Sequence, residues 1–170
     1  MPFSLQPITS ESFYDEAPVR YLIDVEVPAD PDYVWSEFTR QNTLDWCRAL
    51  KKVTYTSPEP YNDKTTRTAD LAPGGITLHE QFFIWEEDPA AHSYKHAFYG
   101  KTSSIPGLKN FGELTAVTPG SNGGSRIVWK FAMRMSGVAL PGFLSNPIAS
   151  LAFGTVKSDT VKHFSQAASA

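Results

Sequence analysis

Five polar side chains capable of acid–base or ionic chemistry interrupt otherwise apolar segments of the chain: Arg67, Glu80, Tyr94, His96 and Glu113. A carboxyl group in apolar surroundings has its charged form disfavoured, so its pKa rises. A partly protonated Glu80 beside His96 or Tyr94 could therefore exchange protons with a bound carbonyl group. Alternatively, Glu80 or Glu113 pairs with Arg67 or His96 in a satisfied internal ion pair. The residues alone leave both interpretations open.

Other chemical motifs are lacking in the sequence. His92 and His96 share a strand face but lie on the order of 13 Å apart, too far to bind one metal directly. The glycine tracts at 74–75 and 121–125 lack the spacing of phosphate-binding loops. The single cysteine, Cys47, excludes an internal disulfide and a cysteine-rich zinc site. We therefore predict that the protein uses no cofactor and no metal.

Composition is typical of one globular domain. The chain has 170 residues, of which 41% are hydrophobic and 13% aromatic, so it can bury a core. A net charge of −3 offers no attraction for nucleic acid or an anionic membrane. No apolar run is long enough for stable membrane insertion, and the N-terminus lacks the features of a signal peptide. These observations predict a cytoplasmic protein without a nucleic-acid partner.

The helical segments lie near the start and at the end of the chain. Asp30 is a suitable N-cap and Pro31 suits the first helical position, so a short helix is expected there. A second short helix is expected over 43–50. Residues 145–167 carry apolar side chains at helical spacing and predict a long amphipathic helix.

The remaining segments predict strands, separated by turns rich in proline and glycine. The expected strands are 20–29, 53–57, 65–71, 76–86, 92–99, 110–117 and 125–135. Such a series indicates an antiparallel meander, which must share its apolar face with the terminal helix. Residues 1–19 read as an extension that lies across a ligand-binding domain of residues 20–170.

Charged residues mark the solvent side of two strands. Ser93 and Lys95 should face outward, so Tyr94, His96 and Phe98 face inward. In the last strand the outward residues are Arg126, Lys130 and Arg134. The inward residues of that strand are Ile127, Trp129, Phe131 and Met133.

Three stretches of sequence resemble a known family: VEVPADPDYVWSEFTR (25–40) with Trp46 after it, GGITLHEQFFIWEEDP (74–89) and RIVWKFAMRM (126–135). Together with the C-terminal helix they resemble the START/Bet v 1-like (SRPBCC) superfamily, and within it the polyketide cyclase/dehydrase and lipid-transport group. The resemblance covers about residues 20–167. It implies the α+β helix-grip fold: a curved antiparallel sheet of about seven strands around a long C-terminal helix, with two short helices after the first strand.

The resemblance also implies a cavity between sheet and helix. Similarity to the plant abscisic-acid receptors places Leu78, Glu80, Phe82 and Ile84 inside. Phe83 and Trp85 would then lie outside, against the extension or a second subunit. The candidate catalytic residues are Glu80, Tyr94 and His96. The expected ligand-binding residues are Arg67, Leu78, Phe82, Phe98, Phe111, Glu113, Trp129, Phe131, Met133, Phe153, Val156 and Thr160.

Three functions fit these expectations. The preferred one is binding of an apolar small molecule of the lipid, polyketide or isoprenoid type. The second is a polyketide cyclase/aromatase or dehydratase that uses the acid–base residues of the cavity. The third is an interaction protein with a filled cavity, whose outer face carries Phe83 and Trp85 and could also form a homodimer.

Overall fold

One antiparallel sheet dominates the structure, a computed structural model that describes residues 2–72, 74–137 and 142–167, without the side chains of 142–152. The strands are β1 (Phe3–Ser4), β2 (Val19–Val27), β3 (Leu50–Tyr55), β4 (Thr66–Leu71), β5 (Ile76–Asp88), β6 (Ser93–Ser103), β7 (Leu108–Pro119) and β8 (Ser125–Met135). The helices are α1 (Phe13–Glu16), α2 (Pro31–Thr39) and α3 (Gly142–Ala167). The strand order is β2-β8-β7-β6-β5-β4-β3, and the short β1 pairs with β6.

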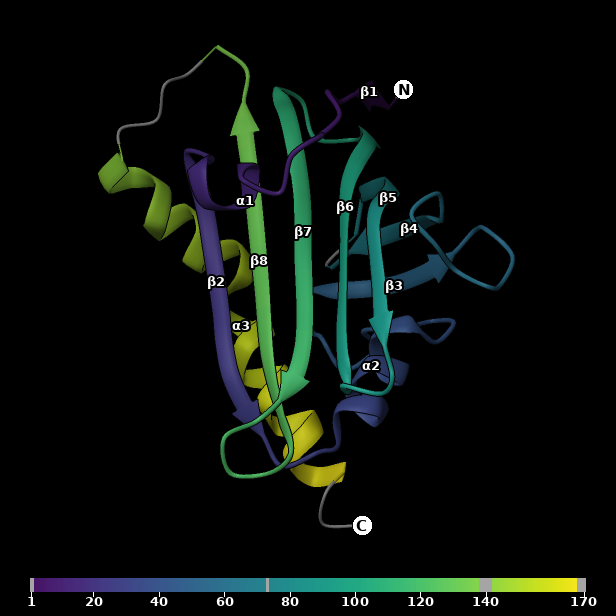
Figure 1. The fold of residues 1–170 in the computed structure, drawn as a ribbon. Coiled ribbons are helices and arrows are strands. Elements are labelled where there is room, and N and C mark those ends of the chain that lie inside the picture. Colours follow the sequence, from purple (N-terminus) through teal and green to yellow (C-terminus); the bar gives the residue numbers. More distant parts are fainter. Residues whose placement is uncertain (1, 73, 138–141, 168–170) are drawn as a thin grey trace.

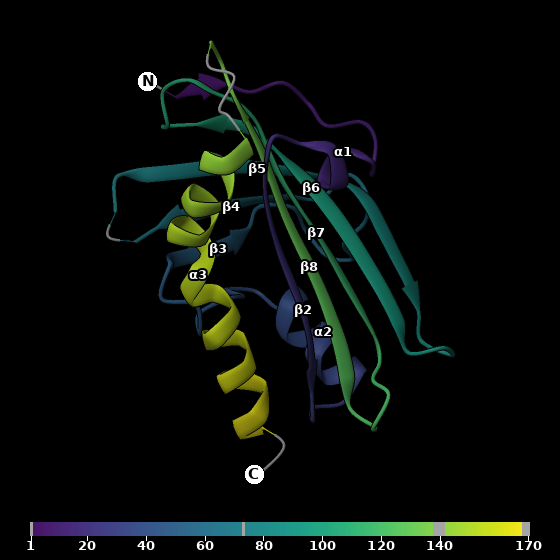
Figure 2. The ribbon, with the colours of Figure 1, turned by 90° about the vertical axis from the view of Figure 1, so that its left-hand side faces the viewer.

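The sheet curves around α3, as Figures 1 and 2 show. The strands β3 and β4 cross behind the others, and α3 runs along the inner face beside β2. The predicted α+β helix-grip fold is thus confirmed, with the strands of the meander joined in sequence. Among the described residues, no helix combines the length and the apolar character needed to cross a bilayer.

The helix after β2 forms for the predicted reasons, but the prediction of a second short helix over 43–50 is wrong. The Asp30 carboxylate accepts a hydrogen bond from the Asp32 amide, and Pro31 occupies the first turn of α2. Residues 41–46 form turns instead of a helix. Asn42 and Leu44 have φ values of 58° and 61°, in the left-handed region, which interrupts a right-handed helix. The long helix begins at Gly142, earlier than the expected 145.

The N-terminal residues cover the outer face of the sheet, opposite α3 (Figure 2). Ile8 and Tyr14 pack against Ala97 and other buried side chains of β6, β7 and β8 in a second, smaller core. The Tyr14 hydroxyl donates to the Phe98 carbonyl oxygen at 2.8 Å. Gly112 permits this close approach, because a Cβ there would lie 2.5 Å from that same oxygen.

A β-bulge in β5 overturns part of the predicted alternation. Phe82 pairs with Phe98 and Ile84 with Ala97, so Phe83 is an extra residue in the ladder. Leu78, Glu80 and Phe82 are buried on the inner side, as expected.

Beyond the bulge, the side chains of β5 lie on the face of the sheet opposite to the predicted one. Ile84 joins Phe83 in the outer core, and Trp85 packs inward against Phe82 and His96. Phe83 contacts Tyr14 of the extension, as expected, whereas the expected inward Ile84 and outward Trp85 are wrong. The outer face therefore does not carry the pair of aromatic residues on which the interaction-protein interpretation depended.

Candidate functional site

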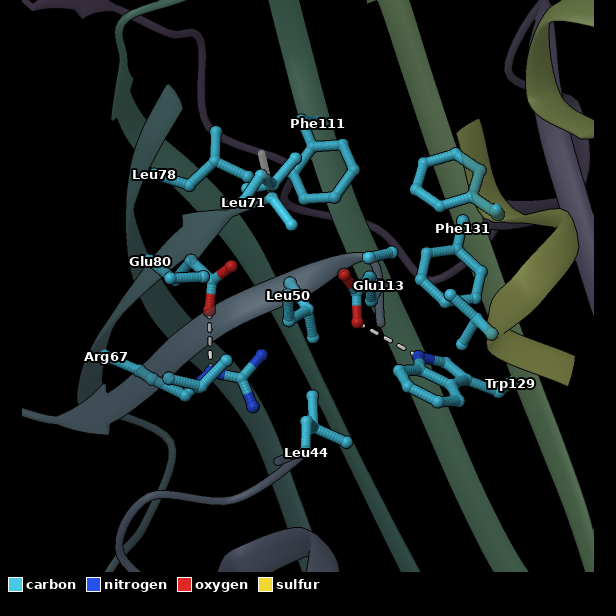
Figure 3. Close-up of a pocket in the computed structure, with 16 residues that line it drawn as sticks. Leu44, Leu50, Arg67, Leu71, Leu78, Glu80, Phe111, Glu113, Trp129 and Phe131 are labelled. Carbon is cyan, nitrogen blue, oxygen red and sulfur yellow. Dashed lines mark hydrogen bonds and ion pairs between the residues drawn. The ribbon is translucent and has the colours of Figure 1, made fainter. Parts of the chain in front are cut away.

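A cavity of about 270 Å³ lies between the inner face of the sheet and α3 (Figure 3). Most of its wall is apolar and comes from the segment before β3, from strands β3, β4, β5, β7 and β8, and from α3. The apolar lining residues are Leu44, Ala49, Leu50, Val53, Ala69, Leu71, Ala72, Leu78, Phe111, Trp129, Phe131, Phe153 and Val156. Three ionisable side chains complete the lining: Arg67, Glu80 and Glu113.

Arg67 and Glu80 form a buried ion pair at one end of the cavity. They stand opposite each other in the ladder between β4 and β5, and Arg67 Nε lies 2.6 Å from Glu80 Oε2. Both side chains are almost inaccessible to solvent, at 2% and 1%. The guanidinium also lies over the ring of Phe98, 4.5 Å from its centroid. Because a carboxylate and aromatic faces surround the guanidinium, its positive charge is stabilised in the interior without contact with water.

Glu113 enters the same cavity from β7 and has a different partner. Its Oε2 accepts a hydrogen bond of 2.9 Å from the indole Nε1 of Trp129, on the neighbouring β8 (Figure 3). Burial raises the pKa of Glu113 to about 8, and the nearby charge of Glu80 adds to this effect. Glu113 keeps some accessible surface although it is enclosed by protein, since it lines the cavity.

The two carboxyl groups therefore differ in protonation. The pKa of Glu80 is raised as well, because burial outweighs the opposing charge and hydrogen bond of Arg67. Among the described residues, no cation contacts Glu113 directly, and Arg67 lowers its pKa only through the charge of the guanidinium. One proton on either carboxyl leaves the group of three side chains without net charge, and the direct contact of Arg67 with Glu80 at 2.6 Å favours the ionised form of Glu80 and a proton on Glu113.

The structure brings nine of the expected site residues to this cavity: Arg67, Leu78, Glu80, Phe111, Glu113, Trp129, Phe131, Phe153 and Val156. Phe82 and Phe98 lie behind the lining, with their rings against the Arg67 guanidinium. Met133 packs at the edge of the main core, and Thr160 is buried where its hydroxyl accepts from Trp46 Nε1 at 3.3 Å.

Tyr94 lies away from the cavity, beside α2. Its hydroxyl donates to Asp32 Oδ1 at 2.5 Å, and its ring stacks on Trp35 with centroids 5.3 Å apart. The hydrogen bond to Asp32 raises the pKa of Tyr94 to about 12. Tyr94 is thus a partner of the first turn of α2 and is not a lining residue.

His96 points inward as expected, but into aromatic side chains. Its ring lies within about 5 Å of the rings of Trp35, Phe82 and Trp85. Neither ring nitrogen has a hydrogen-bond partner among the described residues. Burial, with the charge of Arg67, lowers the pKa of His96 to about 3, so the imidazole is neutral.

Sequence reasoning missed the wall contributed by residues 44–53. Leu44, Ala49, Leu50, Val53 and, after β4, Ala72 line the cavity without having been expected there. Val53 was placed in a strand whose faces were not assigned, and Leu44 in a helix that does not form. The one sequence signal that could have indicated this wall was the alternation of Val53 and Tyr55, both of which are buried in the structure.

The chemistry available in the cavity is that of a neutral carboxylic acid beside a buried ion pair, in apolar surroundings. Such an acid can donate a hydrogen bond or a proton to a carbonyl oxygen. Within the described part of the chain, no group of three or more His, Cys, Asp or Glu side chains is arranged to hold a metal ion.

Comparisons with known proteins place the chain among relatives of the same fold. The family model described as polyketide cyclase/dehydrase and lipid transport matches residues 19–168. An uncharacterised protein of Mycobacterium tuberculosis (strain H37Rv) is 30% identical over 143 residues, which cover 83% of this chain and 81% of the relative.

Two solved structures illustrate the likeness in fold. A START superfamily protein from Mycobacterium smegmatis superposes with a TM-score of 0.67 at 10% identity, over 86% of this chain and 97% of the other. The Zhui aromatase/cyclase from Streptomyces sp. R1128 gives 0.62 at 12% identity, over 88% and 93%.

Proposed function

Since the chain belongs to the polyketide cyclase/dehydrase and lipid-transport family, we propose that it binds an apolar small molecule, of the lipid, polyketide or isoprenoid type, between the sheet and α3. The observation that carries this proposal is the cavity of about 270 Å³ with thirteen apolar residues in its lining. An apolar cavity of about 150 Å³ already suffices to bind benzene. A ligand with two or three fused rings, or a comparable branched chain, suits this volume.

Burial of the ligand's apolar surface supplies the binding energy. At about 25 cal/mol per Å² of apolar surface, a ligand of about 300 Å² gains about 7 kcal/mol before the entropic costs of association. Because those costs reduce the gain, a dissociation constant above about 10 μM is expected for a ligand of this size.

The test fills the cavity by mutation and measures binding of an apolar probe, isopropenylnaphthalene, by calorimetry. Ala69 is buried and lines the cavity, whereas Ala116 lies in the outer core on the opposite face. We expect Ala69→Leu to weaken binding about tenfold or more, because its added methylene and methyl groups occupy ligand volume. Ala116→Leu should bind as the wild type does. Equal binding by both variants would place the probe outside the cavity.

A second candidate function is catalysis, as a polyketide cyclase/aromatase or dehydratase. The observation that favours it is the enclosed Glu113 carboxyl, whose raised pKa suits protonation of a ligand carbonyl while the cavity holds the chain in a reactive shape. In this alternative Glu113, with Glu80 beside it, replaces Tyr94 and His96 as the candidate acid. Turnover of a poly-β-ketone that is lost in Glu113→Gln, with binding retained, would support catalysis; an absence of turnover in the wild type would count against it.

A further inference from the structure

The ionisable groups that face the cavity determine which ligands it can accept. Arg67 comes from β4, Glu80 from β5 and Glu113 from β7, and every other described lining residue is apolar. A ligand that enters therefore meets two carboxyl groups and one guanidinium in a low dielectric.

The positive charge of the cavity is already neutralised. Arg67 Nε contacts Glu80 Oε2 at 2.6 Å, and the guanidinium is covered by the rings of Phe82 and Phe98. A ligand carboxylate at Arg67 would face Glu80 at short range and would leave one uncompensated negative charge in the interior. The ion pair consequently disfavours anionic ligands, although it contains an arginine.

Glu113 presents a hydrogen-bond donor to the cavity. Trp129 Nε1 donates to Oε2 at 2.9 Å, so the carboxyl proton cannot lie on the side of that oxygen that faces the indole. Oε1 has no hydrogen-bond partner among the described residues, and it is the oxygen left to carry a proton into the cavity. A protonated carboxyl in this position can donate a hydrogen bond to an acceptor oxygen of a ligand, and no existing hydrogen bond has to be broken for this.

We propose that the cavity selects neutral ligands with a carbonyl or similar acceptor oxygen, which the protonated Glu113 receives, and that it rejects ligands with a carboxylate. Glu113 is then the specificity-determining residue. This inference rests on the proposed function, because it narrows the ligand class of the same cavity: neutral ketones and related oxygenated molecules bind, and fatty-acid anions do not.

The experiment compares three probes of equal shape that differ in one group: methyl naphthyl ketone, isopropenylnaphthalene and naphthoate. Affinities are measured by calorimetry at neutral pH for the wild type and for Glu113→Leu and Glu113→Gln. We expect the wild type to bind the ketone about fivefold more tightly than the hydrocarbon, since one buried hydrogen bond contributes about 1 kcal/mol. Naphthoate should bind more weakly than either.

The variants separate the donor from the shape of the side chain. Glu113→Leu should lose the preference for the ketone and keep the hydrocarbon, whereas Glu113→Gln retains an amide donor and should keep the preference. Glu87→Gln is a matched control, because Glu87 accepts hydrogen bonds from the indoles of Trp35 and Trp85 but does not line the cavity. This control should leave the order of the three probes unchanged.

The outcomes distinguish this inference from the proposed function. Equal affinity of the wild type for ketone and hydrocarbon, or tight binding of naphthoate, would overturn the inference and leave ligand binding intact. Failure of every probe to bind would overturn the proposed function, and the inference with it. Should Glu113→Leu fail to fold by circular dichroism, the wild-type series and Glu113→Gln still decide.

Discussion

Replacement of Glu113 by Gln tests the protonation state on which the chemistry of the cavity depends. The pKa of Glu113 rises from its ordinary 4.5 to about 8, mainly through burial. Between these two values the folded protein holds a proton on Glu113 that the unfolded chain has released. The folded state therefore binds more protons, and its stability falls as the pH rises through this interval. Gln has the same shape and no such dependence.

The size of the effect follows from the shift. Each pH unit between the two pKa values changes the free energy of unfolding by about 1.4 kcal/mol for one proton. If this dependence holds in full from about pH 5 to pH 8, the free energy of unfolding changes by about 4 kcal/mol. Water that enters the cavity beside its three ionisable side chains would screen part of the charge, and we expect about 2–3 kcal/mol.

The assay is urea unfolding of the wild type and Glu113→Gln at pH 5, 6, 7 and 8. The quantity of interest is the difference in free energy of unfolding between the two proteins, because titrating groups distant from Glu113 contribute equally to both and cancel. We expect the wild type to lose stability relative to the variant with each step upward in pH. A difference that stays constant from pH 5 to pH 8 would show that Glu113 is already ionised, and the charge count of the cavity would be wrong.

Three further predictions concern the buried ion pair, the N-terminal residues on the outer face, and His96. Arg67→Met leaves the Glu80 carboxylate buried without its cation, and should lower the free energy of unfolding by about 3–5 kcal/mol. The pair Arg67→Met/Glu80→Gln should recover most of this loss in urea unfolding, and no recovery would contradict a buried ion pair. Gly112→Ala brings a methyl group 2.5 Å from the Phe98 carbonyl oxygen, so limited proteolysis should cleave the N-terminal residues faster; unchanged resistance would refute the packing. His96→Leu removes a neutral imidazole whose pKa is lowered to about 3. Because the unfolded chain takes up a proton on His96 below about pH 6.5, the wild type should lose more stability on acidification than this variant, and equal acid-unfolding midpoints would refute that.

Charge alternation predicted the faces of the strands well, but not the position of a side chain along them. Arg126, Lys130 and Arg134 marked the outer face of β8, and Trp129 and Phe131 do line the cavity. Tyr94 and His96 also face inward on β6, yet neither reaches the cavity. This strand has 11 residues, about 36 Å at about 3.3 Å each, and α2 covers one end of it. A period of two identifies the side of a sheet and carries no information on what packs there.

The local errors arise where tertiary contacts override pattern. Phe83 is the extra residue of a bulge, and its ring stacks on Tyr14 of the N-terminal segment. The bulge carries Ile84 to the outer core and Trp85 to the inner one. Likewise, the left-handed conformation of Asn42 and Leu44 belongs to a turn that places Leu44 against the cavity. Neither deviation has a signature in the spacing of apolar residues.

The chemistry of the cavity depends on one strand register. Arg67 and Glu80 lie 13 residues apart in the sequence. They meet because the register of β4 and β5, which sets Leu71 opposite Ile76, also sets Arg67 opposite Glu80. A shift of one residue in this hairpin would turn the inner side chains of one strand to the other face and would separate the pair. If Glu80 were the residue turned outward, Glu113 would be the carboxyl left with Arg67 in the lining of the cavity. The register of β4 and β5 thus bears on which of two glutamates keeps its proton, and with it on whether the cavity offers a donor or an anion to its ligand.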